Sequence, residues 1–326
     1  MKRTALLRLI TLCAPALLFS CKPAASGPGA GQATGSGGKV IGFSQSNASE
    51  NAWRTAETQS ILTEGKTRGF EVKLADAQGD QTKQIAALKD FIAQGVSAII
   101  LSPKTTDGWE PVLKEVKAAG IPVILVDRGV SADPSLYATL IASDFVAEGR
   151  MAGEWLVKQT GGAGGVIQLE GSAGADPAIE RRKGFEEALA AAPGLKILAS
   201  QSGDFNRGKG KQVMEAMIKA QGKAITAVYA HNDEMALGAI EALKEAGMNP
   251  GKDVQVVSID GIGDAFKALE AGTLNCTVEC SPILGGMAFD AVEKIAKGEA
   301  PEKKTIVQDR LFDAGSFKAE MPNRKY

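Results

Sequence analysis

The chain has 326 residues, which is enough for two domains of ordinary size. Its 37 basic and 38 acidic side chains nearly cancel, so no strong net field favours nucleic acid as a partner. A single histidine, His231, argues against zinc sites and against catalysis that depends on paired imidazoles or a histidine triad. We therefore expect no metal and no cofactor.

The first 20 residues are built like a secretion signal. Lys2 and Arg3 precede an apolar run from Leu6 to Phe19 that is too short to span a membrane as a finished helix. The next cysteine, Cys21, follows a small residue and resembles the lipidated cysteine of bacterial lipoproteins, although Phe19 is unusual in that motif. We expect a signal peptide over 1–20 and a lipid-anchor cysteine with a flexible tether over 21–38. Ordinary cleavage to a soluble periplasmic protein is the alternative.

From residue 40 onward, short apolar runs alternate with longer helix-period stretches. The predicted strands, in chain order, are Val40–Ser44, Phe70–Ala75, Ala98–Leu101, Pro122–Val126, Val166–Leu169, Lys196–Ser200, Ala227–Ala230, Val254–Ile259 and Asn275–Cys280. The predicted helices are Gln81–Gln94, Trp109–Ala119, Phe145–Lys158, Pro177–Ala192, Arg207–Ala220, Glu234–Ala246 and Ile283–Lys297. Continuous apolar strands are typical of parallel sheets covered on both faces, so the pattern predicts a doubly wound α/β fold.

The strands are too many for one sheet of usual size, which predicts two lobes. We interpret Tyr137–Ser143 as a crossover, and we expect Thr305–Phe312 to return the chain to the first lobe and cross again. The predicted lobes comprise residues 39–143 plus 281–309 and residues 144–280 plus 310–326. Such multiple crossings favour hinge closure around a cleft.

Ligands of open α/β sheets bind beyond the carboxyl ends of the strands, and there this sequence is polar or aromatic. The candidate ligand-binding residues are Ser44, Trp53, Arg54, Glu57, Asp127, Arg128, Arg181, Phe205, Asn232 and Asp260. Carboxylates and guanidinium groups can each hold two neighbouring hydroxyls, and aromatic faces cover the C–H patches of a sugar ring. The pattern therefore predicts a monosaccharide ligand, with Trp53 and Phe205 on either side of the ring. Taken singly, each residue has a structural alternative, such as a turn cap, a surface ion pair or a core ring.

Three other motifs carry weaker signals. Residues 203–210 match a phosphate-binding loop except that Gly210 replaces the required Ser or Thr, and Gly261-Ile262-Gly263 lacks the third glycine of a dinucleotide fingerprint. Cys276 and Cys280 lie four apart on a predicted strand, about 13 Å from each other, which is beyond disulfide reach. We expect two free thiols.

From about Val40 to Phe312 the sequence resembles the type I periplasmic sugar-binding proteins of ABC transporters, relatives of ribose-binding protein, and most closely the galactofuranose binders among them. The segments that carry the resemblance are Gly42–Gln45, Gly108–Glu115, Arg182–Phe185, Gln201–Phe205, Tyr229–Asp233 and Ser258–Gly261. It implies two Rossmann-like lobes joined by three hinge strands, no catalysis, and a ligand held by the candidate residues, with Arg54 and Glu57 distinguishing this subgroup. Cys280 stands where ribose binders carry a hydrogen-bonding glutamine, so the specificity need not follow ribose. The DNA-binding headpiece of the related lac repressor family is absent from this sequence.

The resemblance implies a monomeric solute-binding component of a sugar importer, periplasmic or at the cell surface, held to the membrane by its lipid anchor and partnered by an ABC permease. Two alternatives stay open. Asp127 and Asp260 could act as the paired acids of a glycoside hydrolase. The protein could also be a sugar-sensing receptor for chemotaxis or signalling without transport.

Overall fold

The computed structural model describes residues 40–324 and 326, which form one compact unit. The predicted signal peptide, Cys21 and the tether lie outside the described residues. Within the described part, no helix is both long enough and apolar enough to cross a membrane.

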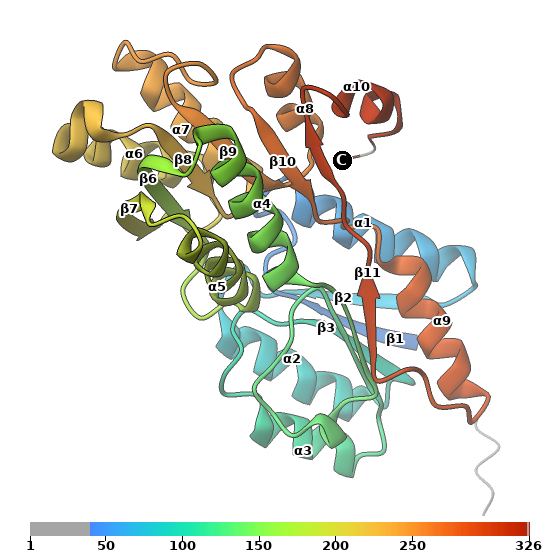
Figure 1. The fold of residues 1–326 in the computed structure, drawn as a ribbon. Coiled ribbons are helices and arrows are strands. Elements are labelled where there is room, and N and C mark those ends of the chain that lie inside the picture. Colours follow the sequence, from blue (N-terminus) through green and yellow to red (C-terminus); the bar gives the residue numbers. More distant parts are fainter. Residues whose placement is uncertain (1–39, 325) are drawn as a thin grey trace, which may run out of the picture. The chain divides into compact units, whose positions relative to one another are not determined.

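The first sheet has six strands, all parallel, in the order β11-β5-β4-β3-β1-β2 (Figure 1). Its strands are β1 (Val40–Gln45), β2 (Glu71–Asp76), β3 (Ala98–Ser102), β4 (Val123–Val126), β5 (Thr139–Ser143) and β11 (Lys304–Val307). The helices α1 (Ala52–Thr67) and α9 (Gly285–Ala296) pack against each other, and α2 (Gln81–Gln94) packs against α3 (Glu110–Ala118). We call this sheet and its four helices the N-terminal lobe.

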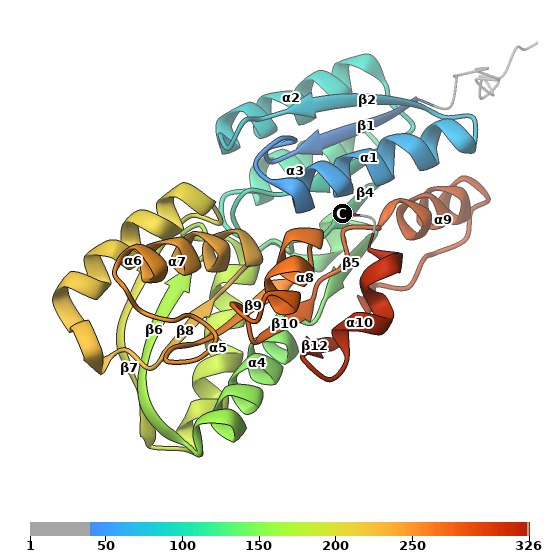
Figure 2. The same cartoon turned by 90° about the horizontal axis from the view of Figure 1, so that it is seen from above.

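The second sheet also has six strands, in the order β12-β10-β9-β8-β6-β7, with β12 antiparallel to β10 and the others parallel. Its strands are β6 (Ala163–Glu170), β7 (Gly194–Ser202), β8 (Ala227–Ala230), β9 (Gln255–Asp260), β10 (Cys276–Glu279) and β12 (Leu311–Asp313). The helices α4 (Phe145–Thr160) and α5 (Asp176–Ala190) lie on one side, and α6 (Arg207–Gln221), α7 (Asp233–Glu245) and α8 (Gly263–Glu270) on the other (Figure 2). The short helix α10 (Phe317–Glu320) packs on α8, and we call this assembly the C-terminal lobe.

The strands form where the sequence offers uninterrupted apolar runs. Every residue of β3, β4 and β8 is buried, as expected for strands with helices on both faces. Three short 3₁₀ helices, Pro134–Leu136, Gly222–Ala224 and Met321–Asn323, complete the described elements. The doubly wound α/β fold predicted from the sequence is confirmed.

The chain passes between the sheets after β5, after β10 and between β11 and β12. This order agrees with the return and second crossing expected over Thr305–Phe312. The segment Tyr137–Ser143 was interpreted only as a crossover, but most of it is β5, which pairs with β4 and β11. The crossing itself begins after Ser143. The exact lobe boundaries, 39–143 plus 281–309 and 144–280 plus 310–326, stay a prediction.

Candidate ligand-binding cleft

The carboxyl ends of both sheets face a cavity that is lined from both lobes and that, with the open solvent at its mouth, encloses about 300 Å³. The residues that line it are Glu50, Asn51, Trp53, Arg54, Asp127, Arg128, Pro177, Arg181, Phe205, Asn232, Asp260 and Cys280. Eight of the ten candidate residues are therefore brought together in one place. This convergence follows from the doubly wound topology, because parallel strands end at the same edge of their sheet.

The first turn of α1 supplies the N-terminal side of the cavity. Asn51 begins the helix as its N-cap, and its side chain accepts a hydrogen bond from the backbone N–H of Arg54 at 2.8 Å. The cap places Trp53 and Arg54 at the cavity, and the Trp53 indole N–H donates to the Cys280 carbonyl at 2.6 Å. That bond satisfies the only donor of the indole and leaves its aromatic face available.

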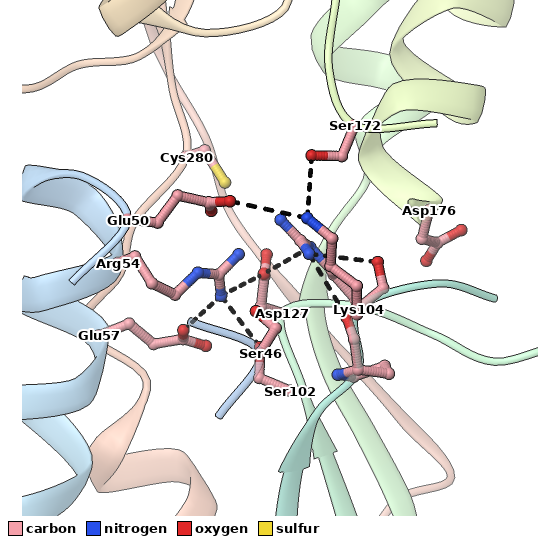
Figure 3. Close-up of polar contacts among 12 residues, drawn as sticks. Ser46, Glu50, Arg54, Glu57, Ser102, Lys104, Asp127, Ser172, Asp176 and Cys280 are labelled. Atoms are coloured by element: carbon pink, nitrogen blue, oxygen red, sulfur yellow. Dashed lines mark hydrogen bonds and ion pairs between the residues drawn. The ribbon is translucent and has the colours of Figure 1, made fainter. Parts of the chain in front are cut away.

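Arg54 and Asp127 form a buried ion pair, drawn in Figure 3. Arg54 Nη1 lies 2.8 Å from Asp127 Oδ2 and donates to Ser102 Oγ at 2.9 Å. Burial alone would lower the pKa of Arg54, but the carboxylates of Glu57 and Asp127 outweigh it and raise the pKa above its ordinary value. Arg54 is therefore charged, as an anchor for hydroxyl groups requires.

Arg128 follows Asp127 directly and reaches across toward the C-terminal lobe. Its guanidinium carbon lies 5.6 Å from the centroid of the Phe205 ring, and its Nη1 contacts the carbonyls of Pro103 and Lys104 at 3.5 and 3.4 Å. Burial, followed by the nearby Arg54 cation, lowers the pKa of Arg128. The Nε atom of Arg128 has no hydrogen-bond partner among the described residues.

Arg181 is the cation of the C-terminal lobe. Its Nε donates to Glu148 at 2.6 Å, its Nη1 donates to the His231 carbonyl at 2.6 Å, and its Nη2 lies 3.6 Å from Asp260 Oδ1. Burial raises the pKa of Asp260 well above its ordinary value, and the Arg181 cation opposes that rise. The C-terminal lobe thus offers a guanidinium and a carboxyl side by side.

Phe205 and Asn232 complete this wall. Phe205 is buried, and the Asn232 amide donates to its carbonyl at 3.2 Å. Asn232 is also the N-cap of α7, where its side chain accepts from the Met235 N–H at 3.1 Å. Asn232 therefore caps a helix and lines the cavity with the same side chain.

Several cavity residues have unusual backbone conformations. Asp127 has φ of 63°, Phe205 has 55° and Asp260 has 122°, a region that residues other than glycine rarely occupy. Such strain persists only where the surrounding structure holds it, and it clusters at functional sites. Asp127 and Asp260 lie at the ends of β4 and β9, and Phe205 lies three residues after β7.

The lobes also touch each other directly beside the cavity. The Gly129 N–H donates to Asp176 Oδ2 at 2.8 Å, the Thr106 N–H donates to the Gly174 carbonyl at 2.9 Å, and Lys104 Nζ contacts Ser172 Oγ at 3.2 Å. Figure 3 shows Lys104 between Glu50 and Ser172. The described arrangement is therefore the one in which the cleft is closed.

Two candidate residues lie behind the cavity wall. Ser44 is fully buried within β1, where Gln84 Nε2 approaches its hydroxyl at 3.5 Å. Glu57 is one helical turn beyond Trp53 and contacts Arg54 instead of the cavity. Conversely, Glu50, Asn51 and Pro177 line the cavity without having been predicted, because they lie in loops or helix starts several residues past the strand ends. The capping asparagine before α1 was the available signal for Asn51.

Cys276 and Cys280 are both free and buried, as their spacing predicts. Cys280 lines the cavity, and its sulfur lies 3.6 Å from Ser143 Oγ. The two residues lie where the crossings after β10 and after β5 begin. Burial raises the pKa of the Cys280 thiol well above its ordinary value. Among residues 40–324 and 326, no three His, Cys, Asp or Glu side chains are grouped so as to hold a metal ion.

Two doubly wound lobes with a polar, aromatic-walled cleft between their strand ends define a two-lobed ligand-binding protein. Residues 41–300 match the periplasmic binding protein domain, and the chain belongs to that family. It is 50% identical to the galactofuranose-binding protein YtfQ of Escherichia coli over 88% of this chain and 91% of that protein.

Two solved structures are also similar to this chain. One is the periplasmic binding protein of the arabinose ABC transporter from Shewanella sp. ANA-3, bound to α- and β-L-arabinofuranose, with a TM-score of 0.85, 49% identity and coverage of 88% of this chain and 95% of that chain. Another, from Mycobacterium smegmatis in complex with β-D-fucofuranose, has a TM-score of 0.85, 47% identity and the same coverage of 88% and 95%. The predicted resemblance to sugar binders is confirmed.

Proposed function

We propose that this protein is the solute-binding component of an ABC-type sugar importer and that it holds a monosaccharide in its furanose form between the two lobes. The observation that carries the proposal is the single cavity to which both lobes contribute guanidinium groups, carboxylates and one aromatic ring each. The similar proteins named above bind galactofuranose, arabinofuranose and fucofuranose.

The charges of the lining favour a neutral ligand. Three guanidinium groups, of Arg54, Arg128 and Arg181, face three carboxyl groups, of Glu50, Asp127 and Asp260. A balanced set can hold hydroxyls as both donors and acceptors without demanding a charge from the ligand. Trp53 and Phe205 supply aromatic faces for the C–H surface of the ring.

Closure couples binding to recognition by the transporter. A sugar that contacts both lobes has a higher affinity for the closed form than for the open form, and only that difference can shift the equilibrium. The permease then distinguishes the closed, loaded protein from the open one. No chemistry on the sugar is part of this role.

The location follows from the N-terminal segment. The signal peptide directs export, lipidation at Cys21 anchors the chain, and the tether over 21–38 leaves the binding unit at the periplasmic or cell-surface side as a monomer. Labelling with a radioactive fatty acid tests the anchor. Incorporation should occur in the natural chain and be lost in Cys21→Ala, whereas equal labelling of both would contradict it.

Calorimetric titration of the purified protein with L-arabinose, D-galactose, D-fucose, D-ribose and D-fructose tests the binding role. We expect at least one saturable titration, strongest among sugars that populate a furanose of the arabino or galacto series. Asp127→Ala should abolish it, because the variant loses a hydroxyl acceptor and leaves Arg54 with one fewer counter-charge. A flat response to every sugar would contradict the proposal.

The hydrolase alternative has its own test, since Asp127 and Asp260 do share the cavity. Incubation with aryl furanosides and pyranosides should release no phenol. Turnover that disappears in Asp260→Asn would replace the binding role with a catalytic one.

A further inference from the structure

Two buried glutamates stand directly behind the cavity, one in each lobe. Glu57 and Glu148 are both fully buried, and neither lines the cavity. Each contacts one of the guanidinium groups that do line it, Arg54 and Arg181 respectively. The same construction therefore occurs twice, on the helices α1 and α4.

In the N-terminal lobe, Glu57 holds Arg54 from within α1. Its Oε2 accepts from Arg54 Nη1 at 2.5 Å and from Gln45 Nε2 at 2.9 Å. Figure 3 shows Glu57 and Asp127 on different sides of the Arg54 guanidinium. The two carboxylates fix the direction of this guanidinium group.

In the C-terminal lobe, Glu148 does the same for Arg181. Its Oε2 accepts from Arg181 Nε at 2.6 Å, which leaves the two terminal nitrogens to meet the His231 carbonyl and Asp260. The ring of Phe145 lies under the guanidinium carbon at 5.3 Å. These contacts hold the Arg181 guanidinium at the position where it lines the cavity.

A buried carboxylate that served only packing would be costly, because removing it from water is opposed unless a charged partner is present. Burial raises the pKa of both glutamates, and the facing arginine opposes the rise in each case. In each lobe the arginine is the charged partner that offsets the cost of burying the glutamate. Without the glutamate, Arg54 would pair with Asp127 and Arg181 with Asp260. The guanidinium and carboxyl groups of each pair would then be less available to bind sugar hydroxyls.

We infer that Glu57 and Glu148 are positioning residues that orient Arg54 and Arg181 toward the bound sugar, each acting through its arginine and not by touching the ligand. The inference rests on the proposed sugar-binding function. Glu57, predicted to bind the ligand, is instead assigned the role of orienting Arg54. Glu148 was not predicted from the sequence to have any role in binding.

The experiment is a pair of double-mutant cycles measured by calorimetry with the tightest sugar of the panel. Glu57→Gln and Glu148→Gln keep the shape of the side chain, and each should weaken binding by about tenfold or more, the contribution of one charge-assisted hydrogen bond. Once the arginine is gone the glutamate should matter little, so R54Q/E57Q should bind as R54Q does, and R181Q/E148Q as R181Q does. A role in folding alone would not produce this non-additivity.

The chain offers matched controls. Glu64 of α1 accepts from Arg68, the C-cap of that helix, at 2.7 Å, and Glu187 of α5 accepts from Arg150 of α4 at 2.7 Å, both away from the cavity. Glu64→Gln and Glu187→Gln should leave the affinity unchanged. Denaturant unfolding without sugar separates folding defects from binding defects. If a single glutamine variant does not fold, the comparison of each double variant with its arginine variant still decides.

Natural affinity in E57Q and E148Q, or a further loss of affinity when the glutamate is changed in the arginine-free background, would overturn the inference. Both results presuppose that the natural protein binds sugar. Failure of the natural protein to bind any sugar would instead remove the proposed function, so the two failures are distinguishable.

Discussion

Gly171, the residue directly after β6, lies against the ring of Phe205. A Cβ atom at this position would be 1.9 Å from Cζ of the ring, far inside any permitted contact. Phe205 can therefore form the wall of the cleft only because residue 171 has no side chain.

We predict that Gly171→Ala displaces the Phe205 ring, weakens sugar binding by roughly tenfold and lowers the free energy of unfolding by about 1–3 kcal/mol, as overpacking does. Calorimetry and denaturant unfolding measure the two effects. Gly286→Ala is the control, because a Cβ atom there meets nothing within 4 Å. Unchanged affinity in Gly171→Ala would mean that the Phe205 ring does not contact the sugar.

The sequence predicted correctly that several polar residues at strand ends would line the cavity. Asp127 and Asp260 were identified because each directly follows or closes an apolar run, and topology then brings them together. Ser44 was misplaced by the same rule, since it still lies inside β1 and is fully buried there. The strand-end rule did not predict Glu50 and Pro177, because the length of a loop, and not the position of a strand end, brings them to the cavity. The spacing of residues in the sequence does not show how far a loop carries them toward the cavity.

At the scale of elements, α5 begins with a contact between the lobes. Asp176, its first residue, accepts the Gly129 N–H of the N-terminal lobe at 2.8 Å. Because this bond joins the two lobes, we expect it to stabilise the closed form relative to an open one.

We predict that Asp176→Ala weakens sugar binding about fivefold, which corresponds to one hydrogen bond of roughly 1 kcal/mol. Small-angle scattering should also show a larger radius of gyration for the sugar-free variant than for the natural protein. The exposed Asp90→Ala on α2 serves as the control. Identical scattering and affinity in all three proteins would show that this contact does not influence closure.

The segment between β11 and β12, the last crossing between the lobes, carries Asp309. Burial, followed by the Glu148 carboxylate, raises the pKa of Asp309 to about 8, while Ser143 and Arg181 act in the opposite direction and Glu279 raises it further. Between about pH 4 and pH 8 the folded state thus favours the protonated carboxyl, whereas the same carboxyl is ionised in the unfolded chain. Its contribution to stability is complete below about pH 4 and is lost as the pH rises toward 8.

We predict that the natural protein loses stability relative to Asp309→Asn as the pH rises from 5 to 8, with a slope of at most about 1.4 kcal/mol per pH unit. Denaturant unfolding at several pH values measures the difference, in which the titration of all other groups cancels. A difference that stays constant over this range would show that Asp309 titrates normally.

The elements themselves were largely predictable, with two instructive exceptions. The helix α1 is not among the predicted helix ranges, because it buries Arg54, Glu57 and Thr58 and so lacks an apolar stripe. The strand β5 was interpreted as a crossover, because the run has few helix-stop cues before Asp144. Its pairing with β11 joins Leu140 to Lys304, which lies 164 positions later. Strand order within each sheet is likewise a long-range property.

At the scale of the molecule, the three crossings between the sheets and the few direct contacts across the cleft suit a change between open and closed forms. Trp53 belongs to a helix of the N-terminal lobe and packs with the core of the C-terminal lobe, so it contacts both lobes. Addition of a bound sugar should therefore both compact the protein and protect the Trp53 indole from solvent, which its fluorescence reports.

The most direct test of the account is a crystal structure of the protein with the sugar that binds tightest. We predict one sugar ring between Trp53 and Phe205, with hydroxyls bonded to Asp127 and Arg54 from the N-terminal lobe and to Arg181 and Asp260 from the C-terminal lobe. A sugar bound outside this cleft, or one that contacts a single lobe, would contradict it.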